Sequence, residues 1–266
     1  MAETEARGLL APDEPAAYEI VNEAGSAPLL LLCDHATHYL PRALGTLGLS
    51  EAELSRHIAY DIGVAEVARG LAERLDAPVV FNGYSRLVID PNRSLDDPTL
   101  IPQLGDGVIV PGNRDLSRAE IQARIEGFHA PYHAAISDKL DALTARGRAP
   151  AVISVHSFTP VMKGVERPWH IGILWNLDPR LPLPLMARLR AQGIPVGENE
   201  PYSGQDGHGH TLHLHAEPRG LANALIEIRQ DLIDTHHGAA VWTAKLADSL
   251  KAVLEDQSLY KIEQYG

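Results

Sequence analysis

Short, mostly aliphatic runs alternate along this chain with segments of helical periodicity, and no other feature restricts its fold as strongly. Four runs have the pattern of strands that are buried on both faces of a parallel sheet: residues 29–33, 151–155, 171–175 and 225–228. Helices are predicted after Ser50 and after Ser117, because each serine is followed three residues later by a glutamate that completes a capping box. Strands that alternate with helices indicate an α/β fold with helices on both faces of one sheet.

Weaker patterns predict the remaining elements. The helix after Ser50 continues to residue 75 with a break near Tyr60, and the helix after Ser117 is kinked at Pro131. Shorter elements are expected as follows: strands at 18–21, 78–81, 87–89 and near Pro195, and helices at 180–192 and 238–255. Residues 91–116 are rich in proline and glycine and are expected to form a long loop, which inside a compact domain usually either lines a site or is disordered.

Composition limits the organisation and the partners of the chain. Residues 1–27 show no sustained periodicity and are expected to form an N-terminal arm, followed by a single domain over 28–266. The formal charge of −12 argues against binding to nucleic acid, which depends on lysine and arginine. No apolar run is long enough to cross a membrane, and the acidic N-terminus lacks the pattern of a signal peptide. We therefore expect a cytoplasmic protein without a nucleic-acid or membrane partner, and self-association into a homo-oligomer is left open.

The histidines gather in a few segments, and two of them lie just beyond predicted buried strands. These two are His35 and His156, and the carboxyl ends of the strands are where sites of open α/β sheets usually form. Two imidazoles and one carboxylate supply the three protein ligands of a catalytic zinc site and leave a fourth position for water. The third ligand is either Asp61, in the helical stretch after the first strand, or His38, three residues after His35.

Glu227 lies inside a predicted aliphatic strand, where its desolvation is costly unless its pKa is raised or a cation pairs with it. Beside a metal-activated water it would act as a general base and then pass the proton to the leaving amine. The alternative is an ion pair with Arg229 or Arg86. Arg93, together with Arg86, would hold a substrate carboxylate, because a guanidinium binds a carboxylate through two parallel hydrogen bonds. Asp90 is expected to orient Arg93 or its loop.

The other histidine groups carry weaker signals. His129 and His133 have helical spacing but lie beside the apolar stripe of their helix, which favours capping or solvated side chains. The glycine- and histidine-rich segment 204–215 is either a second metal site or a mobile loop. Its last residues alternate as in a strand and would place His213 and His215 on one face, with one of them facing the active centre.

The sequence lacks the motifs of several common enzyme classes. It contains no HExxH, Walker A, GxSxG or GxGxxG motif, which removes the commonest zincin, nucleotide-binding, α/β-hydrolase and Rossmann interpretations. Its single cysteine, Cys33, excludes an intrachain disulfide and a CxxC zinc site.

Five short segments stand out in order along the chain: Asp34-His35-Ala36, Asp61, the block SRLVIDPNR at 85–93, His156-Ser157 and Glu227-Ile228-Arg229. In order and approximate spacing they resemble the N-formylglutamate amidohydrolase family, and the similarity extends over about 28–250. The Arg-x-x-x-Asp-x-Asn-Arg block is its most specific part. The family is similar in fold to zinc carboxypeptidases and aspartoacylase. The resemblance therefore implies a phosphorylase/hydrolase-like three-layer sandwich, with a mixed, mostly parallel sheet between helices and one zinc ion.

The resemblance also implies roles for individual residues of the metal site. Zinc would be held by His35, Asp61 and His156, and Glu227 would activate the water. In zinc carboxypeptidases the second ligand is an acid three residues after the first histidine, whereas that position is His38 in this chain.

For the substrate, the resemblance implies that Asn92 and Arg93 hold a carboxylate. The segment Pro131-Tyr132-His133 also resembles the family, which would turn His133 towards the pocket. Together with Arg86 and His213, these residues form the expected substrate site.

The function expected is metal-dependent hydrolysis of the N-acyl bond of a small acidic amino acid. The model reaction converts N-formylglutamate and water to formate and glutamate, within amino-acid catabolism such as histidine degradation. One alternative is a zinc peptidase or deacylase with a different N-acyl-amino acid or a short peptide as substrate. The other is a small-molecule sensor that has lost turnover on the same scaffold, because fold does not determine function. Glu227 argues against the sensor, since a sensor needs no proton shuttle.

Overall fold

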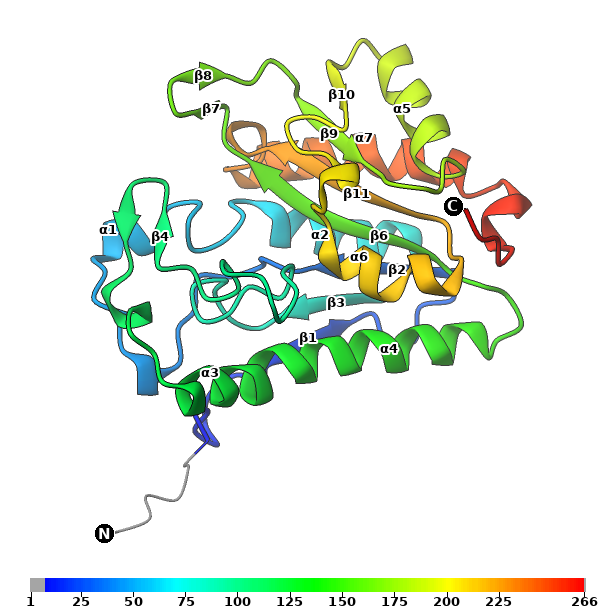
Figure 1. Cartoon of the computed structure of the whole chain (residues 1–266). Coiled ribbons are helices and arrows are strands. Elements are labelled where there is room, and N and C mark those ends of the chain that lie inside the picture. Colours follow the sequence, from blue (N-terminus) through cyan, green and yellow to red (C-terminus); the bar gives the residue numbers. More distant parts are fainter. Residues whose placement is uncertain (1–7, 266) are drawn as a thin grey trace, which may run out of the picture.

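The computed structural model describes residues 8–265 and contains a central sheet of seven strands (Figure 1). In the order in which they lie side by side, the strands are β1 (Tyr18–Val21), β3 (Val79–Asn82), β2 (Leu29–Cys33), β6 (Ala151–Phe158), β11 (Asn223–Arg229), β9 (Ile171–Leu174) and β10 (Val196–Glu198). The pairs β1–β3 and β9–β11 are antiparallel, and the other neighbouring pairs are parallel. The sheet is therefore mixed and mostly parallel, as the resemblance implied.

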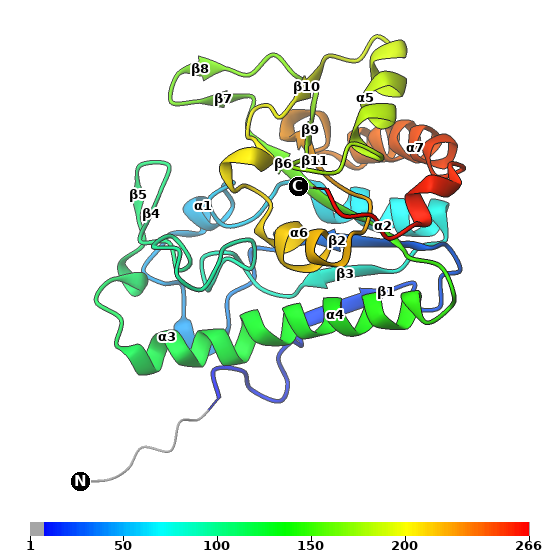
Figure 2. The same cartoon turned by 45° about the vertical axis from the view of Figure 1, so that its right-hand side comes forward.

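Helices cover both faces of the sheet, which confirms the three-layer arrangement, and Figure 2 shows the layers from a second side. One layer holds α2 (Val64–Leu75), α5 (Pro182–Ala191) and α7 (His236–Val253), and the other holds α4 (Ala130–Thr144) and α6 (His210–His215). Successive residues of β2 point to opposite faces, so that Leu29 and Leu31 pack under the first layer and Leu30 and Leu32 under the second. Because the strand is buried on both faces, its sequence is uninterruptedly aliphatic.

Both predicted capping boxes form. Ser50 caps α1 (Glu51–Leu54) and Ser117 caps α3 (Arg118–Arg124), and in each case the serine and the glutamate bond each other's backbone N–H. The helix after Ser50 ends after one turn and α2 begins only at Val64, so the break expected near Tyr60 is present.

The region around Pro131 is irregular at a slightly earlier point than predicted. A π-helical segment, Ile125–His129, joins α3 to α4, and the α-helical pattern resumes at the residue before the proline. Because proline has no N–H to donate to the carbonyl four residues earlier, the preceding turn is free to widen.

Residues 87–89 were predicted as a strand, and this prediction is wrong. Residues 86–88 form a turn in which the Val88 N–H donates to the Ser85 carbonyl (2.9 Å). The Leu87 and Val88 side chains are fully buried in two small apolar clusters outside the sheet. The apolar run therefore reflects the packing of a loop.

Two small hairpins lie outside the sheet, on the same side of the molecule in Figures 1 and 2. The first, β4 (Leu104–Gly105) with β5 (Val108–Ile109), lies inside the predicted long loop 91–116. The second is β7 (Val161–Met162) with β8 (Val165–Glu166), which follows the end of β6.

The N-terminal segment predicted as an arm contributes an edge strand to the sheet. Residues 18–21 pair antiparallel with β3, at the edge where a strand was expected, and the Tyr84 hydroxyl donates to the Pro15 carbonyl (2.7 Å). Residues 1–7 of the predicted arm lie outside the described residues. Over residues 8–265, none of the helices combines the length and the apolar character that a membrane crossing requires.

Candidate active site

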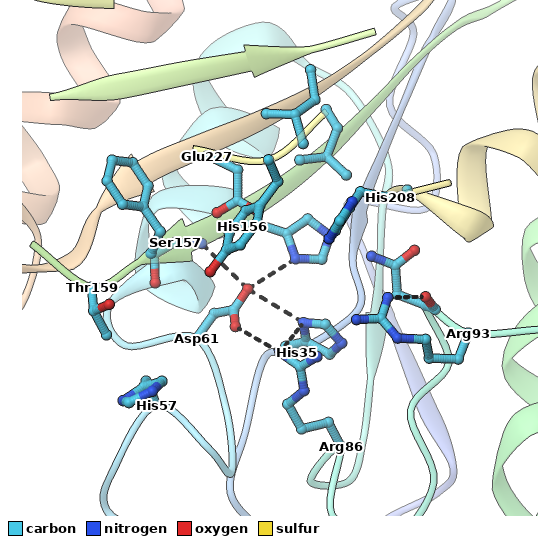
Figure 3. Close-up of a pocket in the computed structure, with 16 residues that line it drawn as sticks. His35, His57, Asp61, Arg86, Arg93, His156, Ser157, Thr159, His208 and Glu227 are labelled. Atoms are coloured by element: carbon cyan, nitrogen blue, oxygen red, sulfur yellow. Dashed lines mark hydrogen bonds and ion pairs between the residues drawn. The ribbon is translucent and has the colours of Figure 1, made fainter. Parts of the chain in front are cut away.

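Three neighbouring strands bring the candidate residues to one end of the sheet (Figure 3). His35 follows β2 and Glu227 is part of β11; β6 extends to Phe158, so His156 lies inside this strand rather than just beyond it. His156 and Glu227 are register partners on adjacent parallel strands, so both side chains project from the face covered by α4 and α6. Asp61 lies just before α2, and its N–H donates to the His35 carbonyl (3.0 Å).

His35, Asp61 and His156 form a buried cluster, in which one ligand atom from each residue lies within 4.8 Å of the other two. Asp61 Oδ2 lies 2.9 Å from His156 Nδ1 and 3.4 Å from His35 Nδ1. His38, the competing third ligand, is exposed and packs its ring against Tyr60. Of the two alternatives, Asp61 is the one that the fold brings to the two histidines.

The outer nitrogen of each imidazole faces a second carboxylate. His35 Nε2 lies 2.7 Å from Asp90 Oδ1, and His156 Nε2 lies 2.9 Å from Asp34 Oδ2. Because a carboxylate accepts, each Nε2 donates, and the neutral form of each ring presents the lone pair of its Nδ1 to Asp61. Metal-binding histidines commonly have such a carboxylate behind the ring. Two lone pairs and a carboxylate oxygen that face one point fit a divalent cation such as zinc.

Asp34 is fully buried and receives hydrogen bonds from several elements. Its carboxylate accepts from the hydroxyls of Tyr132 on α4 (2.9 Å), Ser154 on β6 (2.9 Å) and Thr211 on α6 (2.8 Å), as well as from His156. Burial by itself raises the pKa of Asp34. The hydrogen bond from His156 and the positive charge of His156 outweigh this effect and hold the pKa of Asp34 well below its ordinary value. A charged Asp34 therefore fixes the orientation of the His156 ring.

Glu227 is buried beside the cluster. Its Oε2 has no hydrogen-bond partner within residues 8–265. Burial is the main reason that the pKa of Glu227 rises to about 7; the charge of His156 opposes this rise and the charge of Asp61 adds to it. A carboxyl group that titrates near neutral pH is suited to both accepting and donating a proton.

The arginines considered as ion-pair partners of Glu227 pair with other residues. Arg229 Nε lies 2.8 Å from Asp231 Oδ1, and Arg86 Nη2 lies 2.6 Å from Asp90 Oδ2. Of the two outcomes expected for a carboxylate in this strand, the raised pKa is the one found.

The cluster lines a cavity of about 130 Å³ that also contains the predicted residues Arg86, Asn92 and Arg93. The Asn92 side-chain oxygen accepts from the Thr211 N–H (3.1 Å), so the amide nitrogen is the part of this side chain left for the cavity. The Arg93 Nη1 donates to the Asn92 carbonyl (3.0 Å). Asp90, expected to orient Arg93 or its loop, contacts His35 and Arg86 and accepts from the Asn92 N–H (2.9 Å).

Two predicted substrate contacts do not reach this cavity. His133 Nε2 donates to the Pro91 carbonyl (3.0 Å), and its Nδ1 lies 2.8 Å from His215 Nε2. His213 Nε2 lies 3.6 Å from Glu217 Oε1, and His213 borders a smaller neighbouring cavity. The strand-like pattern at 211–215 was misleading, because the segment forms α6. In a helix, residues two apart point in different directions, so His213 and His215 do not share a face.

Several residues that line the cavity were not predicted from the sequence, among them the ring-bearing residues His57, Tyr202 and His208. The His208 ring stacks on the Tyr202 ring, with centroids 5.1 Å apart, and the Tyr202 hydroxyl accepts from Arg167 Nη2 (3.1 Å). The only signal in the sequence was the histidine-rich composition of 204–215, which does not tell which ring enters the cavity.

The His133–His215 pair predicts a pH-dependent stability. The Pro91 carbonyl can only accept, so His133 donates from Nε2 and accepts at Nδ1 from His215. Burial is the main cause that lowers the pKa of His133 to about 3 and that of His215 to about 4. The charged or titratable groups that also face the pair are His129, His210, Asp34 and Arg219.

Both folded-state pKa values lie below the ordinary histidine value of 6.5, so the unfolded chain binds protons that the folded chain does not. Stability is therefore expected to fall as the pH falls from about 6.5 towards 4. Between pH 7 and pH 5, His215 alone should contribute about 2 kcal/mol to this loss. Urea unfolding at both pH values should show that His215→Gln, whose amide donates to His133 without titrating, loses about 2 kcal/mol less than the wild type. Equal losses would contradict the prediction.

Comparisons with known proteins give the following matches. The family model for N-formylglutamate amidohydrolase matches residues 27–234. Among solved structures, a gene product of Agrobacterium tumefaciens (Atu2144) is 38% identical, with 93% of this chain and 98% of that chain covered and a TM-score of 0.89. The N-formylglutamate amidohydrolase of Ralstonia eutropha is 22% identical, with 90% and 97% covered and a TM-score of 0.66, a likeness that shows the fold alone. No curated protein matches the chain.

Proposed function

The chain belongs to the N-formylglutamate amidohydrolase family, whose members hydrolyse an amide, and we propose that it hydrolyses the N-acyl bond of a small anionic amino acid. N-formylglutamate, which yields formate and glutamate, is the reference substrate. The observation that supports this most directly is the buried His35–Asp61–His156 cluster, with Glu227 in the wall of the same cavity. The expected setting, cytoplasmic amino-acid catabolism such as histidine degradation, stays a prediction, as does a homo-oligomer.

We assign His35, Asp61 and His156 as the ligands of one divalent metal ion, with zinc as the expected metal. The donor set supports this assignment, because two Nδ1 atoms and a carboxylate oxygen face one point while Asp90 and Asp34 hold the outer nitrogens. When bound, such an ion would polarise the acyl carbonyl group and lower the pKa of a water molecule.

The substrate would be oriented by the residues on the loop after Asp90. The Asn92 side-chain amide and the Arg93 guanidinium would donate to a substrate carboxylate. Arg86, whose Nη1 lies 3.7 Å from Asp61 Oδ1, would stabilise negative charge that develops on the acyl oxygen.

Glu227 would carry the proton. Its carboxylate takes a proton from water as the water oxygen bonds to the acyl carbon. The resulting carboxyl group gives this proton to the amide nitrogen as the carbon–nitrogen bond breaks, so the amine leaves and Glu227 returns to the carboxylate. A pKa of about 7 supports both transfers near neutral pH.

Incubation of metal-replete protein with N-formylglutamate tests the proposal, with formate and glutamate measured separately. Release of the two products in equal amounts is expected. A rise in melting temperature on addition of the compound, without either product, would instead support the sensor.

Replacement of Arg93 by glutamine is expected to raise KM for N-formylglutamate by about tenfold to a hundredfold, with a smaller effect on kcat. The reason is that a hydrogen bond to a charged group contributes about 1.5–3 kcal/mol to binding. Steady-state kinetics measure both constants. Arg74→Gln, on the exposed side of α2, is the matched control and should leave KM unchanged. A KM within about twofold of the wild type would remove Arg93 from the substrate site.

A further inference from the structure

A second hollow adjoins the cavity that holds the cluster, here called the catalytic cavity. The catalytic cavity measures about 130 Å³, and the second hollow, here called the outer hollow, measures about 320 Å³. The residues that line both spaces are His57, Arg86, Arg93 and Tyr202, so the two spaces meet along this boundary. In Figure 3, His57 and Arg86 lie across Asp61 from Glu227. Two of the four boundary residues therefore lie on the side of the cluster away from the proposed base.

The walls of the outer hollow beyond this boundary are largely apolar. They include Ile58, Pro102, Leu104 and Met162. Most of the charged groups at this hollow already have partners: Arg86 pairs with Asp90 at 2.6 Å, and Asp106 pairs with Arg56 at 2.7 Å. Lys163, at the turn of the β7–β8 hairpin, also lines the hollow and is exposed. The hollow thus offers apolar contact more than sites for a second anion.

The two hairpins that flank the outer hollow each expose an apolar face. Leu104 lies opposite Ile109 in the first hairpin, and Met162 lies opposite Val165 in the second, so each pair shares one side of its ribbon. Leu104 is 64% exposed, Ile109 55% and Val165 68%. A two-stranded ribbon is only marginally stable alone in water, and apolar side chains gathered at the mouth of a cavity commonly contact a ligand.

The proposed orientation of the substrate directs one part of it to this hollow. The substrate carboxylate is assigned to Asn92, which lines only the catalytic cavity, and to Arg93, which lines both spaces. The acyl oxygen is assigned to Arg86, which lines both spaces, so the substituent on the acyl carbon would lie next to their boundary. A formyl group carries only hydrogen there and leaves the outer hollow unfilled.

We propose that the outer hollow is an acyl-binding subsite and that the enzyme acts on N-acyl-amino acids with an apolar acyl chain of several carbon atoms. The inference rests on the proposed function and names the substrate class of the same site. Residues of the two hairpins, Leu104 and Met162 in particular, would then determine specificity through contact with the acyl chain.

The test compares N-acetyl-, N-butanoyl- and N-hexanoylglutamate, which share the same amide chemistry, with N-formylglutamate assayed alongside. Burial of one methylene group favours binding by about fourfold, so kcat/KM is expected to rise by about this factor per methylene until the hollow is filled. Met162→Asp should flatten the rise along the series. Val161→Asp is the matched control, because Val161 is the adjacent exposed residue on the opposite side of the same ribbon.

The outcomes separate the inference from the proposed function. A rise along the series that Met162→Asp removes and Val161→Asp preserves supports the acyl subsite. Cleavage of N-formylglutamate combined with a flat or falling series overturns the subsite and leaves the proposed function intact. A rise that Met162→Asp does not change also overturns it, because the acyl chain would then lie elsewhere. Cleavage of none of the four compounds overturns the proposed function itself.

Discussion

Replacement of Glu227 by glutamine is expected to lower kcat for N-formylglutamate by about a hundredfold to ten-thousandfold, the range typical of losing a general acid–base group. Glutamine has nearly the same shape but cannot take a proton from water or give one to the leaving nitrogen. Because Glu227 is not one of the three assigned metal ligands, the metal content of the purified variant should equal that of the wild type. Single-turnover kinetics combined with elemental analysis measure both quantities.

Glu198→Gln is the matched control, since Glu198 is an exposed glutamate on another strand of the same sheet, β10. It should leave kcat unchanged. If Glu227→Gln kept more than about a tenth of the wild-type kcat, the proton would have to move through another group, and the proposed role of Glu227 would be wrong.

Loss of a ligand from the His35–Asp61–His156 cluster is expected to abolish both metal binding and activity. The effect of a metal ion on the reacting carbonyl and water is worth several kcal/mol, so kcat of His156→Ala should fall by about a thousandfold or more. The metal content measured by elemental analysis should fall from about one ion per chain to nearly none, since two protein ligands hold a metal ion weakly. Treatment of the wild type with a chelator should have the same effect on activity, and added zinc should restore it.

His38→Ala is the control that also decides between the two candidates for the third ligand. His38 is exposed and contacts Tyr60 rather than the cluster, so its removal should leave metal content and kcat unchanged, whereas Asp61→Ala should lose both. Loss of metal from His38→Ala with retention in Asp61→Ala would reverse the assignment.

The parts of the fold that could be predicted from the sequence are those that patterns over a few residues determine. β2 begins and ends with the aliphatic run 29–33, because burial on both faces leaves no room for a polar residue. Ser50 and Ser117 cap their helices because a capping box involves only four consecutive residues. His35 and His156 could be placed near each other because the strands that carry them are parallel neighbours.

Short apolar or alternating patterns led to wrong strand predictions at 87–89 and 211–215. In the first segment, Leu87 and Val88 are apolar because a loop packs over them. In the second, the alternation of histidine and leucine fits a strand, but the chain forms one short helix that buries Leu212 and leaves Leu214 exposed. A run of five residues does not separate these possibilities, because tertiary contacts decide between them.

The side chains that orient the cluster could not be predicted because their partners are far apart in the sequence. Asp34 accepts from Tyr132, 98 residues away, and from Thr211, 177 residues away. Neither contact follows from any local spacing. His208 enters the cavity from a glycine-rich segment, for which the sequence indicates no single conformation.

The register of β6 and β11 fixes the relative position of two residues of the proposed active site without any contribution from the segments outside the sheet. His156 and Glu227 are register partners on two hydrogen-bonded strands, so the separation of their backbones is set by the spacing of about 4.8 Å between neighbouring strands in any sheet. The two hairpins and the loop over 91–116, by contrast, are not part of the seven-stranded sheet. A chain built in this way can exchange one substrate for another by remodelling its periphery, while the atoms that cleave the amide stay aligned.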